Sequence, residues 1–193
     1  MGNIYLVGFM ATGKTSVGQE LAKKKKWLFV DLDNLIELKE KMAIADIFAK
    51  KGEPYFRKVE TEVLKKVSQE KNFVVACGGG IVIKPLNIKI MKEEGKIICL
   101  SALPEVILKR ASGHTHRPLL NTANPKERVE LLLKFRAPYY AKADKIIDTS
   151  KLSIEQVVQV VLKVTKSLVK RQEDFPRRGK SSGAAKTNQD MTH

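Results

Sequence analysis

Short apolar runs that favour β-structure recur along the chain, and segments with helical periodicity separate them. The apolar runs predict strands at Ile4 to Val7, Leu28 to Val30, Phe73 to Ala76, Ile97 to Leu100 and Ile146 to Ile147. The periodic segments predict helices at Lys14 to Lys25, Asp33 to Lys50, Pro54 to Glu70, Lys84 to Glu94, Pro104 to Ser112, Pro125 to Phe135 and Ile154 to Lys170. Because strands and helices alternate, the pattern predicts an α/β fold with a parallel sheet covered by helices on both faces.

Length and composition predict one compact domain. The chain has 193 residues and is 43% hydrophobic, which suffices for a single buried core. From about Arg171 to His193, Gly, Ser, Lys, Arg and Thr replace apolar residues. This segment therefore predicts a disordered basic tail behind a domain of residues 1–170. Cys77 and Cys99 each end or interrupt an apolar run, where a reduced cysteine usually acts as a small hydrophobe.

The sequence predicts a cytoplasmic protein. No apolar run approaches the roughly 20 residues needed to cross a bilayer. The amino terminus enters a strand-like segment at once, in place of a signal-peptide pattern. We therefore expect no membrane partner. Because no apolar surface stripe stands out beyond the needs of the core, we also expect a monomer.

The formal net charge of +15 raises the question of nucleic-acid binding, since a basic face attracts phosphate backbones whatever their sequence. No helix-turn-helix, zinc-finger or RNP-like pattern accompanies the charge. We interpret it mainly as solubility and attraction of small anions such as ATP and carboxylates. No nucleic-acid partner is expected.

A phosphate-binding loop follows the first predicted strand. The segment Gly8-Phe9-Met10-Ala11-Thr12-Gly13-Lys14-Thr15 matches the pattern GxxxxGK[ST] and opens a predicted helix, which is the context that this motif requires. Backbone N–H groups of such a loop surround phosphate oxygens, Lys14 bridges the β and γ phosphates, and the Thr15 hydroxyl is a ligand for Mg²⁺. The predicted ATP-binding residues here are Ala11, Thr12, Gly13, Lys14, Thr15 and Ser16.

Two carboxylates end the second predicted strand. Residues two apart in an extended chain share a face, so Asp31 and Asp33 can act at one location, one near Mg²⁺ and the other near an acceptor hydroxyl. The alternative for Asp33 is a helix amino-terminal cap with no role in chemistry. The phosphate-binding loop upstream favours the functional interpretation.

Further candidates are a glycine run and four arginines. Gly78 to Gly80 follow the third predicted strand and let a backbone approach a small ligand, although such a run alone is only a turn. Arg57 lies one turn into a helix begun by Gly52-Glu53-Pro54, a position that more often carries a surface ion pair. Arg110, Arg117 and Arg136 lie in a basic stretch between the fourth and fifth predicted strands. That stretch predicts a mobile lid over the phosphates, or else a solvated helical excursion.

Taken together, these motifs resemble the shikimate kinase family, from Asn3 to about Lys170. The resemblance rests on Gly8 to Thr15, Asp31-Leu32-Asp33, Gly52-Glu53 with Phe56-Arg57 and Glu60, Gly78-Gly79-Gly80, Arg117-Pro118-Leu119-Leu120, and Arg136-Ala137-Pro138-Tyr139-Tyr140. It implies a three-layer P-loop kinase fold with a five-stranded parallel sheet in the order 2-3-1-4-5 and a lid at about residues 110–124. It also implies ATP-dependent phosphorylation of the shikimate 3-hydroxyl, a step of aromatic amino acid biosynthesis that yields 3-phosphoshikimate and ADP.

The resemblance also implies a role for each matching residue. Shikimate would be held by Asp33, Arg57, Gly79, Gly80 and Arg136. The phosphoryl group would be stabilised by Lys14 and Arg117, and Mg²⁺ would be bound through Thr15 and Asp31. Arg110 would lie near adenine. Lys14, Asp33 and Arg117 are thus the expected catalytic residues.

Two rival functions remain open. The first keeps the P-loop but changes the acceptor to gluconate, a nucleoside monophosphate or another small alcohol. Arg57 and Arg136 favour an acceptor with a carboxylate, and Asp33 favours hydroxyls over a second phosphate. The second rival is a non-catalytic or RNA-associated protein, against which the set of Lys14, Thr15, Asp31 and Asp33 argues.

Overall fold

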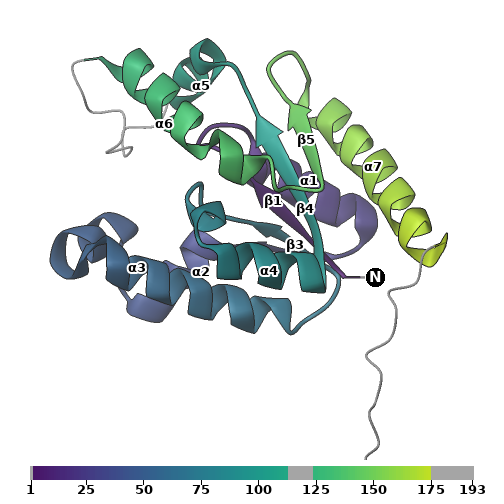
Figure 1. Ribbon diagram of the computed structural model, residues 1–193, viewed down its shortest axis with the longest axis horizontal. Helices are drawn as coiled ribbons and strands as arrows, with labels where there is room; N and C mark the ends of the chain where they lie inside the picture. The colour runs from purple at the N-terminus through teal and green to yellow at the C-terminus, as the bar shows by residue number, and fades with distance from the viewer. Residues whose placement is uncertain (1, 113–123, 175–193) are drawn as a thin grey trace, which may run out of the picture.

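The computed structural model describes residues 2–112 and 124–174, and for residues 168–174 the backbone alone. The strands are β1 (Asn3–Val7), β2 (Leu28–Asp31), β3 (Phe73–Ala76), β4 (Gly95–Ser101) and β5 (Lys145–Asp148). The helices are α1 (Lys14–Lys25), α2 (Leu32–Glu40), α3 (Ile44–Ser68), η1 (Ile81–Ile83, a 3₁₀ turn), α4 (Pro85–Glu94), α5 (Pro104–Ala111), α6 (Pro125–Tyr140) and α7 (Ile154–Asp174). Figure 1 shows the sheet at the centre with helices on both sides of it.

The five strands form one parallel sheet in the order β2-β3-β1-β4-β5, as the resemblance implied. β1 is the middle strand and every one of its residues is buried, which explains its unbroken apolar sequence. Its side chains alternate between the faces: Ile4 and Leu6 lie on one side of the sheet, and Tyr5 and Val7 on the other. The predicted fold class is confirmed.

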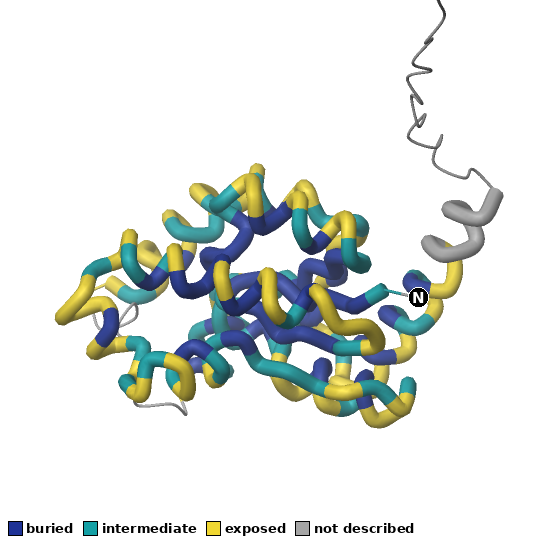
Figure 2. The backbone as a smooth tube through the Cα atoms, turned by 90° about the horizontal axis from the view of Figure 1, so that it is seen from below, coloured by how far each residue is buried: buried dark blue, intermediate teal, exposed yellow. Residues whose placement is uncertain are grey.

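Two helical layers cover the sheet. α1 and α7 pack on the face of Ile4 and Leu6, while α2, α3 and α4 pack on the face of Tyr5 and Val7. In the tube view the buried positions run through the middle of the molecule and the exposed ones follow its outline (Figure 2). α5 and α6 form a separate small cluster with Phe9, directly after β1. These layers leave the carboxyl ends of the strands as the place where a ligand site can form.

Some predicted element bounds were wrong. The single helix predicted over residues 33–50 is interrupted, because Lys41 adopts a left-handed conformation (φ 52°) that ends α2. The Glu37 carboxylate then accepts a hydrogen bond from the Ile44 N–H at 2.9 Å, which caps the start of α3. Gly52, with φ 79° and ψ 168°, separates α3 into two helical parts, so the predicted new start before Arg57 is correct.

Two predicted helices continue further than expected. α6 runs through Pro138 to Tyr140 instead of ending at Phe135, and α7 runs to Asp174 instead of Lys170. Residues 113–123 of the predicted lid, Arg117 among them, and residues 175–193 of the predicted tail lie outside the described residues. Cys77 and Cys99 are buried and unpaired with each other, as expected of small hydrophobic residues. In the part of the chain that is described, none of the helices has the length and apolar character needed to span a bilayer.

Candidate active site

The loop between β1 and α1 has the backbone conformation of a phosphate cradle. Gly8 (φ 136°), Ala11 (φ 59°) and Gly13 (φ 95°) all have positive φ angles. Only glycine fits at position 8, because a Cβ atom there would clash with the carbonyl oxygen of Leu100 on the neighbouring strand β4. The Thr12 hydroxyl donates to the Phe9 carbonyl at 2.8 Å and closes the loop on itself. Such a run of turns directs backbone N–H groups into a concave anion site.

Lys14 lies at the mouth of this loop. Its Nζ donates to the carbonyl oxygens of Gly8 and Phe9, at 3.0 Å and 2.8 Å. Burial lowers the pKa of Lys14 to about 8, and the nearby Asp33 carboxylate opposes that shift. The ammonium is therefore held in position by backbone acceptors, in a partly desolvated site where an added phosphate would interact with it strongly.

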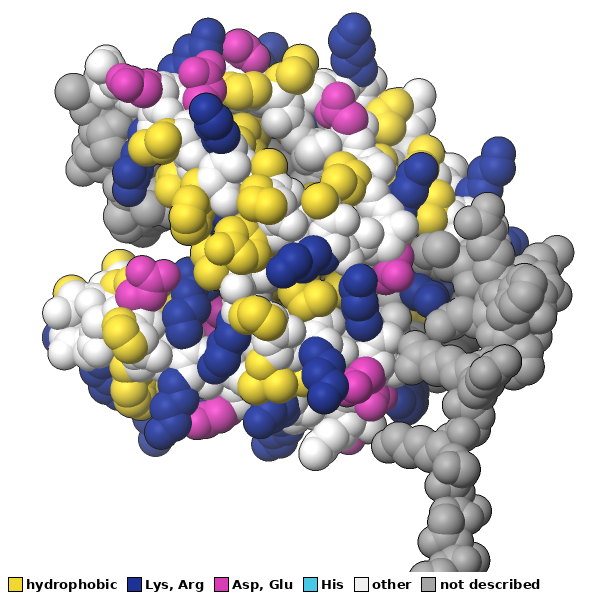
Figure 3. Space-filling view, viewed as in Figure 1, with side chains coloured by type: hydrophobic (Ala, Val, Ile, Leu, Met, Phe, Trp, Pro, Cys, Tyr) yellow, Lys and Arg dark blue, Asp and Glu magenta, His cyan; other side chains and the backbone are white. Residues whose placement is uncertain are grey.

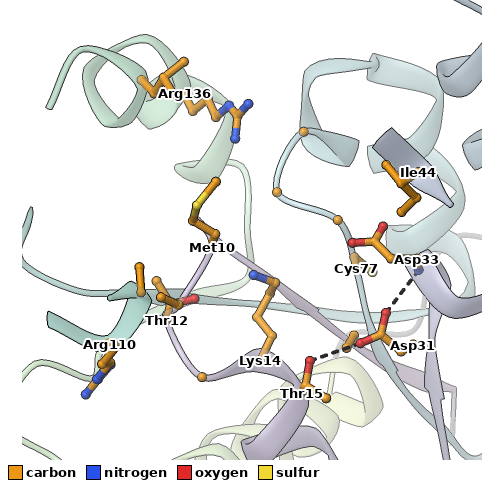
Figure 4. A pocket seen from close by; sticks show the side chains of 18 of the residues that line it. Met10, Thr12, Lys14, Thr15, Asp31, Asp33, Ile44, Cys77, Arg110 and Arg136 are labelled. Atoms are coloured by element: carbon orange, nitrogen blue, oxygen red, sulfur yellow. Dashed lines mark hydrogen bonds between the residues drawn. The ribbon is translucent and has the colours of Figure 1, made fainter. Parts of the chain in front are cut away.

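Asp31 joins the loop to the second strand. Its Oδ2 accepts a hydrogen bond from the Thr15 hydroxyl at 3.0 Å, and its Oδ1 accepts one from the Asp33 N–H at 3.1 Å (Figure 4). Asp31, not Asp33, is thus the amino-terminal cap of α2. The prediction that Asp31 and Asp33 share one face of an extended strand was wrong. The backbone is helical from Leu32 onward, and Asp33 lies in the first helical turn.

Asp33 reaches the same cleft from α2. Burial raises the pKa of its carboxyl group to about 6, and Asp31 adds to the shift while Lys14 opposes it. In the close-up view Asp31 and Asp33 lie across the cleft from Arg110 and Arg136 (Figure 4). A carboxyl group with a pKa close to neutrality is suited to accept a proton from a hydroxyl.

Arg57 is fixed by two carboxylates on its own helix. Its Nη1 donates to both oxygens of Glu60 at 3.0 Å and 2.9 Å, and its Nε and Nη2 donate to Glu53 at 3.1 Å. Glu60 is only 1% exposed, and burial raises its pKa to about 7 although the Arg57 guanidinium lowers it. The pair holds the arginine at the edge of the cleft, next to Gly80.

Each glycine of the run after β3 lies against a different functional group. A Cβ atom at Gly78 would come within 2.9 Å of the Asp33 carboxylate and 3.1 Å of Glu60. A Cβ atom at Gly80 would lie 2.8 Å from the Cζ atom of Arg57. At Gly79 it would lie 3.2 Å from the Nη1 atom of Arg136. The glycines therefore give four charged side chains access to one small space.

Arg136 enters this space from α6. Its guanidinium lies 5.5 Å from the centre of the Phe9 ring, and its Nε is buried without a hydrogen-bond partner among the described residues. The hydroxyl of Tyr140, one helical turn later, donates to the Gly79 carbonyl at 2.8 Å. Burial raises the pKa of Tyr140 to about 12, so that the phenol remains a donor at neutral pH.

Arg110 lies at the other end of the cleft. Its Nη1 donates to the Thr149 hydroxyl at 3.0 Å and its Nη2 to the Thr149 carbonyl at 2.7 Å. The Thr149 hydroxyl in turn lies 3.2 Å from the carbonyl oxygen of Thr12. These contacts fix the last turn of α5 beside the phosphate-binding loop.

All the predicted site residues that the structure describes line one open cleft of about 2250 Å³. They are Ala11, Thr12, Gly13, Lys14, Thr15, Ser16, Asp31, Asp33, Arg57, Gly79, Gly80, Arg110 and Arg136. Arg117 lies outside the described residues. The phosphate loop thus shares a single cleft with a pocket that combines two arginines and a carboxylate. The family model for shikimate kinase matches residues 10–166 of this chain.

The chain belongs to the shikimate kinase family.

Relatives from several bacteria agree with this family. The shikimate kinase of Thermoanaerobacter pseudethanolicus is 45% identical over 163 residues, which cover 84% of this chain and 95% of that protein. The shikimate kinase of Thermodesulfovibrio yellowstonii is 47% identical over 163 residues, with 84% and 94% covered. The predicted family and enzyme class, a kinase, are confirmed.

Solved structures show the same fold. Shikimate kinase from Acinetobacter baumannii, in complex with shikimate, superposes with a TM-score of 0.82 at 37% identity, over 87% of this chain and 94% of that one. A gluconokinase from Sinorhizobium meliloti superposes with a TM-score of 0.58 at 14% identity, over 91% of this chain and 98% of that one. The second likeness shows the fold alone.

Sequence reasoning did not assign a site role to Glu60, although this shikimate kinase family member buries it beside Arg57. A signal was present, because Glu60 is a charged residue on the helical face formed by Phe56, Val59 and Val63. A charge on an apolar face needs a partner, and Arg57 three residues earlier provides it.

Proposed function

We propose that the protein transfers the γ-phosphoryl group of ATP to the 3-hydroxyl of shikimate, giving 3-phosphoshikimate and ADP. One observation carries the proposal. The cleft joins a phosphate-binding loop to a pocket in which Arg57, Arg136 and Asp33 converge around the glycine run. Shikimate carries a carboxylate and vicinal hydroxyls, which match two arginines and one carboxylate. In the related enzyme from Acinetobacter baumannii, shikimate is the bound ligand.

On the nucleotide side, residues 11–16 would bind the phosphates of ATP through backbone N–H groups and the Lys14 ammonium. Arg110 would lie near adenine, and Arg117 would approach the transferring phosphoryl group. These groups would neutralise negative charge and hold the reactants in line, which is most of what phosphoryl transfer requires.

Thr15 and Asp31 fit a Mg²⁺ ion bound together with ATP. Their side-chain oxygens lie 3.0 Å apart at the loop, and both are hard oxygen donors. Among the described residues no group of three or more His, Cys, Asp or Glu side chains could enclose a metal alone. Mg²⁺ usually takes one or two protein ligands and completes its shell with phosphates and water. When bound, it would reduce the charge repulsion between the phosphates and the acceptor.

On the acceptor side, Arg57 and Arg136 would bind the carboxylate of shikimate by charge-assisted hydrogen bonds. Gly79 and Gly80 would let the ring approach the backbone. Asp33 would accept a hydrogen bond from the attacking hydroxyl, orient its oxygen toward the γ phosphate and take its proton.

The first experiment is ADP release from ATP and Mg²⁺ with shikimate, gluconate, AMP or no acceptor. We expect shikimate alone to raise the rate, and EDTA in excess of Mg²⁺ to abolish it. Stimulation by gluconate or AMP without shikimate would leave the phosphate loop intact and refute the acceptor pocket. Acceptor-independent binding of RNA with a steep salt dependence and no phosphotransfer would support the RNA-associated alternative.

The distribution of charge on the face that Figure 3 draws gives that alternative little support. Figure 3 shows Lys and Arg side chains interspersed with acidic and apolar ones over this face, with no continuous basic stripe. Nucleic-acid binding surfaces usually gather such residues along one face or helix.

We further propose that residues 1–170 form the catalytic unit of a cytoplasmic monomer and that residues 171–193 add no group to the reaction. The family model ends at residue 166, before this segment. Among the described residues, most exposed large apolar side chains are scattered over different elements, for example Leu38 on α2 and Ile154 on α7, which supports a monomer. Leu131 and Phe135 on α6 are the one pair among them that shares an element. Truncation after Lys170, at the proposed boundary, should leave kcat/KM within about twofold of wild type, and light scattering should give the monomer mass. A tenfold loss would contradict the proposed catalytic unit, and a dimer mass would contradict the proposed monomer.

A further inference from the structure

Helix α6 meets the acceptor pocket at two side chains. Arg136 enters the pocket, and Tyr140 contacts the glycine run beside it. We propose that Tyr140 is a positioning residue that sets the place of Arg136 for binding of the acceptor carboxylate. The inference rests on the proposed function, and it concerns a side chain that does not itself line the cleft.

Arg136 depends on its surroundings for its position. Its Nε has no hydrogen-bond partner in the described part of the chain, and its guanidinium is held by the face of Phe9 at 5.5 Å. A ring face restrains a cation in distance much more than in orientation. The direction of the guanidinium is therefore set by the helix that carries it and by the neighbouring Tyr140 side chain, with which it interacts electrostatically.

Tyr140 fixes that helix against the pocket. Residues four apart on a helix share a face, so Tyr140 and Arg136 both point from α6 toward the glycine run. The Tyr140 ring is 7% exposed and packs in the main core with Val7, Cys77 and Ile81. Its hydroxyl donates to the Gly79 carbonyl at 2.8 Å, the same glycine whose Cβ position is 3.2 Å from the Arg136 Nη1 atom.

The attachment matters because Pro138 lies between the two residues. Proline has no backbone N–H, so α6 lacks the hydrogen bond to the carbonyl of Lys134 within the turn that connects Arg136 to Tyr140. With that turn weakened, a fixed point at Tyr140 determines where the helix ends and where Arg136 projects. Loss of the hydroxyl would also leave a carbonyl of the glycine run without its partner.

The neighbouring tyrosine provides a matched control. Tyr139 lies on the same helix and is half-buried, and its ring lies 6.0 Å from that of Phe135. Its hydroxyl makes no hydrogen bond with any described residue, and it does not line the cleft. Tyr139→Phe removes the same chemical group as Tyr140→Phe, but at a position that has no hydrogen bond to the glycine run.

The test compares Tyr140→Phe with Tyr139→Phe in the coupled ADP-release assay. We expect Tyr140→Phe to raise the KM for shikimate about tenfold, with kcat lowered less than about threefold and the KM for ATP unchanged. Tyr139→Phe should match wild type in all three constants. In an Arg136→Ala background, Tyr140→Phe should raise the shikimate KM by less than about twofold further, because its partner is absent.

Several outcomes would overturn the inference. They are an unchanged shikimate KM, equal changes in the KM for ATP and shikimate, or the full tenfold effect in the Arg136→Ala background. A Tyr140→Phe chain that fails to fold, by circular dichroism, would likewise make the hydroxyl a requirement of the core. Failure of the proposed function is distinguishable, since wild-type protein would then release no ADP in response to shikimate.

Discussion

Replacement of Lys14 by methionine should lower kcat by about a thousandfold or more, because it removes the positive charge at the mouth of the phosphate loop. Methionine is nearly as long as the aliphatic part of lysine, so the loop should keep its packing. The Gly8 and Phe9 carbonyls would lose their donor, at 3.0 Å and 2.8 Å, but can be hydrated from the open cleft. The measurement is single-turnover phosphotransfer at saturating ATP and shikimate.

Lys23→Met is the matched control for that variant. Lys23 lies in the last turn of the same helix, α1, and is exposed. It should retain kcat within about twofold, as expected of a surface residue. More than a tenth of wild-type turnover in Lys14→Met would contradict the role given to this ammonium.

Asp33→Asn should lower kcat by about a hundred- to ten-thousandfold, since an amide cannot take the proton of the acceptor hydroxyl. The KM for ATP should change by less than about threefold, because the phosphate loop is intact. Wild-type turnover in this variant would refute the role of Asp33. An intermediate loss in which the acid limb of the pH profile persists would assign Asp33 to orienting the hydroxyl alone.

The pH dependence of kcat/KM for shikimate tests the role of Asp33 independently of the substitution. Because the pKa of Asp33 is raised to about 6, the carboxylate that must accept the proton is lost as pH falls below that value. At saturating ATP, kcat/KM for shikimate should then fall about tenfold per pH unit on the acid side. Glu60, with a pKa raised to about 7, lies close enough to contribute. A Glu60→Gln variant separates them, since the acid limb should persist there and vanish in Asp33→Asn.

The raised pKa of Asp33 also makes the stability of the fold depend on pH in a defined direction. A carboxyl group whose pKa is higher in the folded state than in the unfolded state favours folding when it is protonated. That contribution is complete below the unfolded value of 3.8 and is lost as pH rises through about 6. Asp33→Asn should therefore raise Tm at pH 8 relative to wild type, and much less so at pH 4. A lower Tm at pH 8 would indicate structural damage, and the kinetic result would then need another variant.

The location of the site could be predicted from strong local signals, whereas the order of the strands was implied only by the family resemblance. The unbroken apolar sequence of β1 and the glycines that flank Lys14 identify the central strand and its loop. The other motifs then fixed the family, and the family implied the strand order.

Details that depend on tertiary contacts could not be predicted. The end of α2 at Lys41 depends on a Glu37 side chain that caps the next helix, and no periodicity reports such a contact. Pro138 is a helix-breaking residue by local rules, yet α6 continues past it because Tyr140 is buried in the core and bonded to Gly79. Asp33 was expected on an extended strand, and only the fold shows that α2 has already begun.

The segment between β2 and β3 carries several of the proposed acceptor-binding groups in one continuous stretch of the chain. Residues 32–72 contribute Asp33, Arg57 and Glu60, while the phosphate loop belongs to β1 and α1 on the central strand. Substitutions in that one continuous segment would alter most of the charged acceptor groups, while the phosphate loop, Arg136 and the glycine run, which all lie outside the segment, stay unchanged.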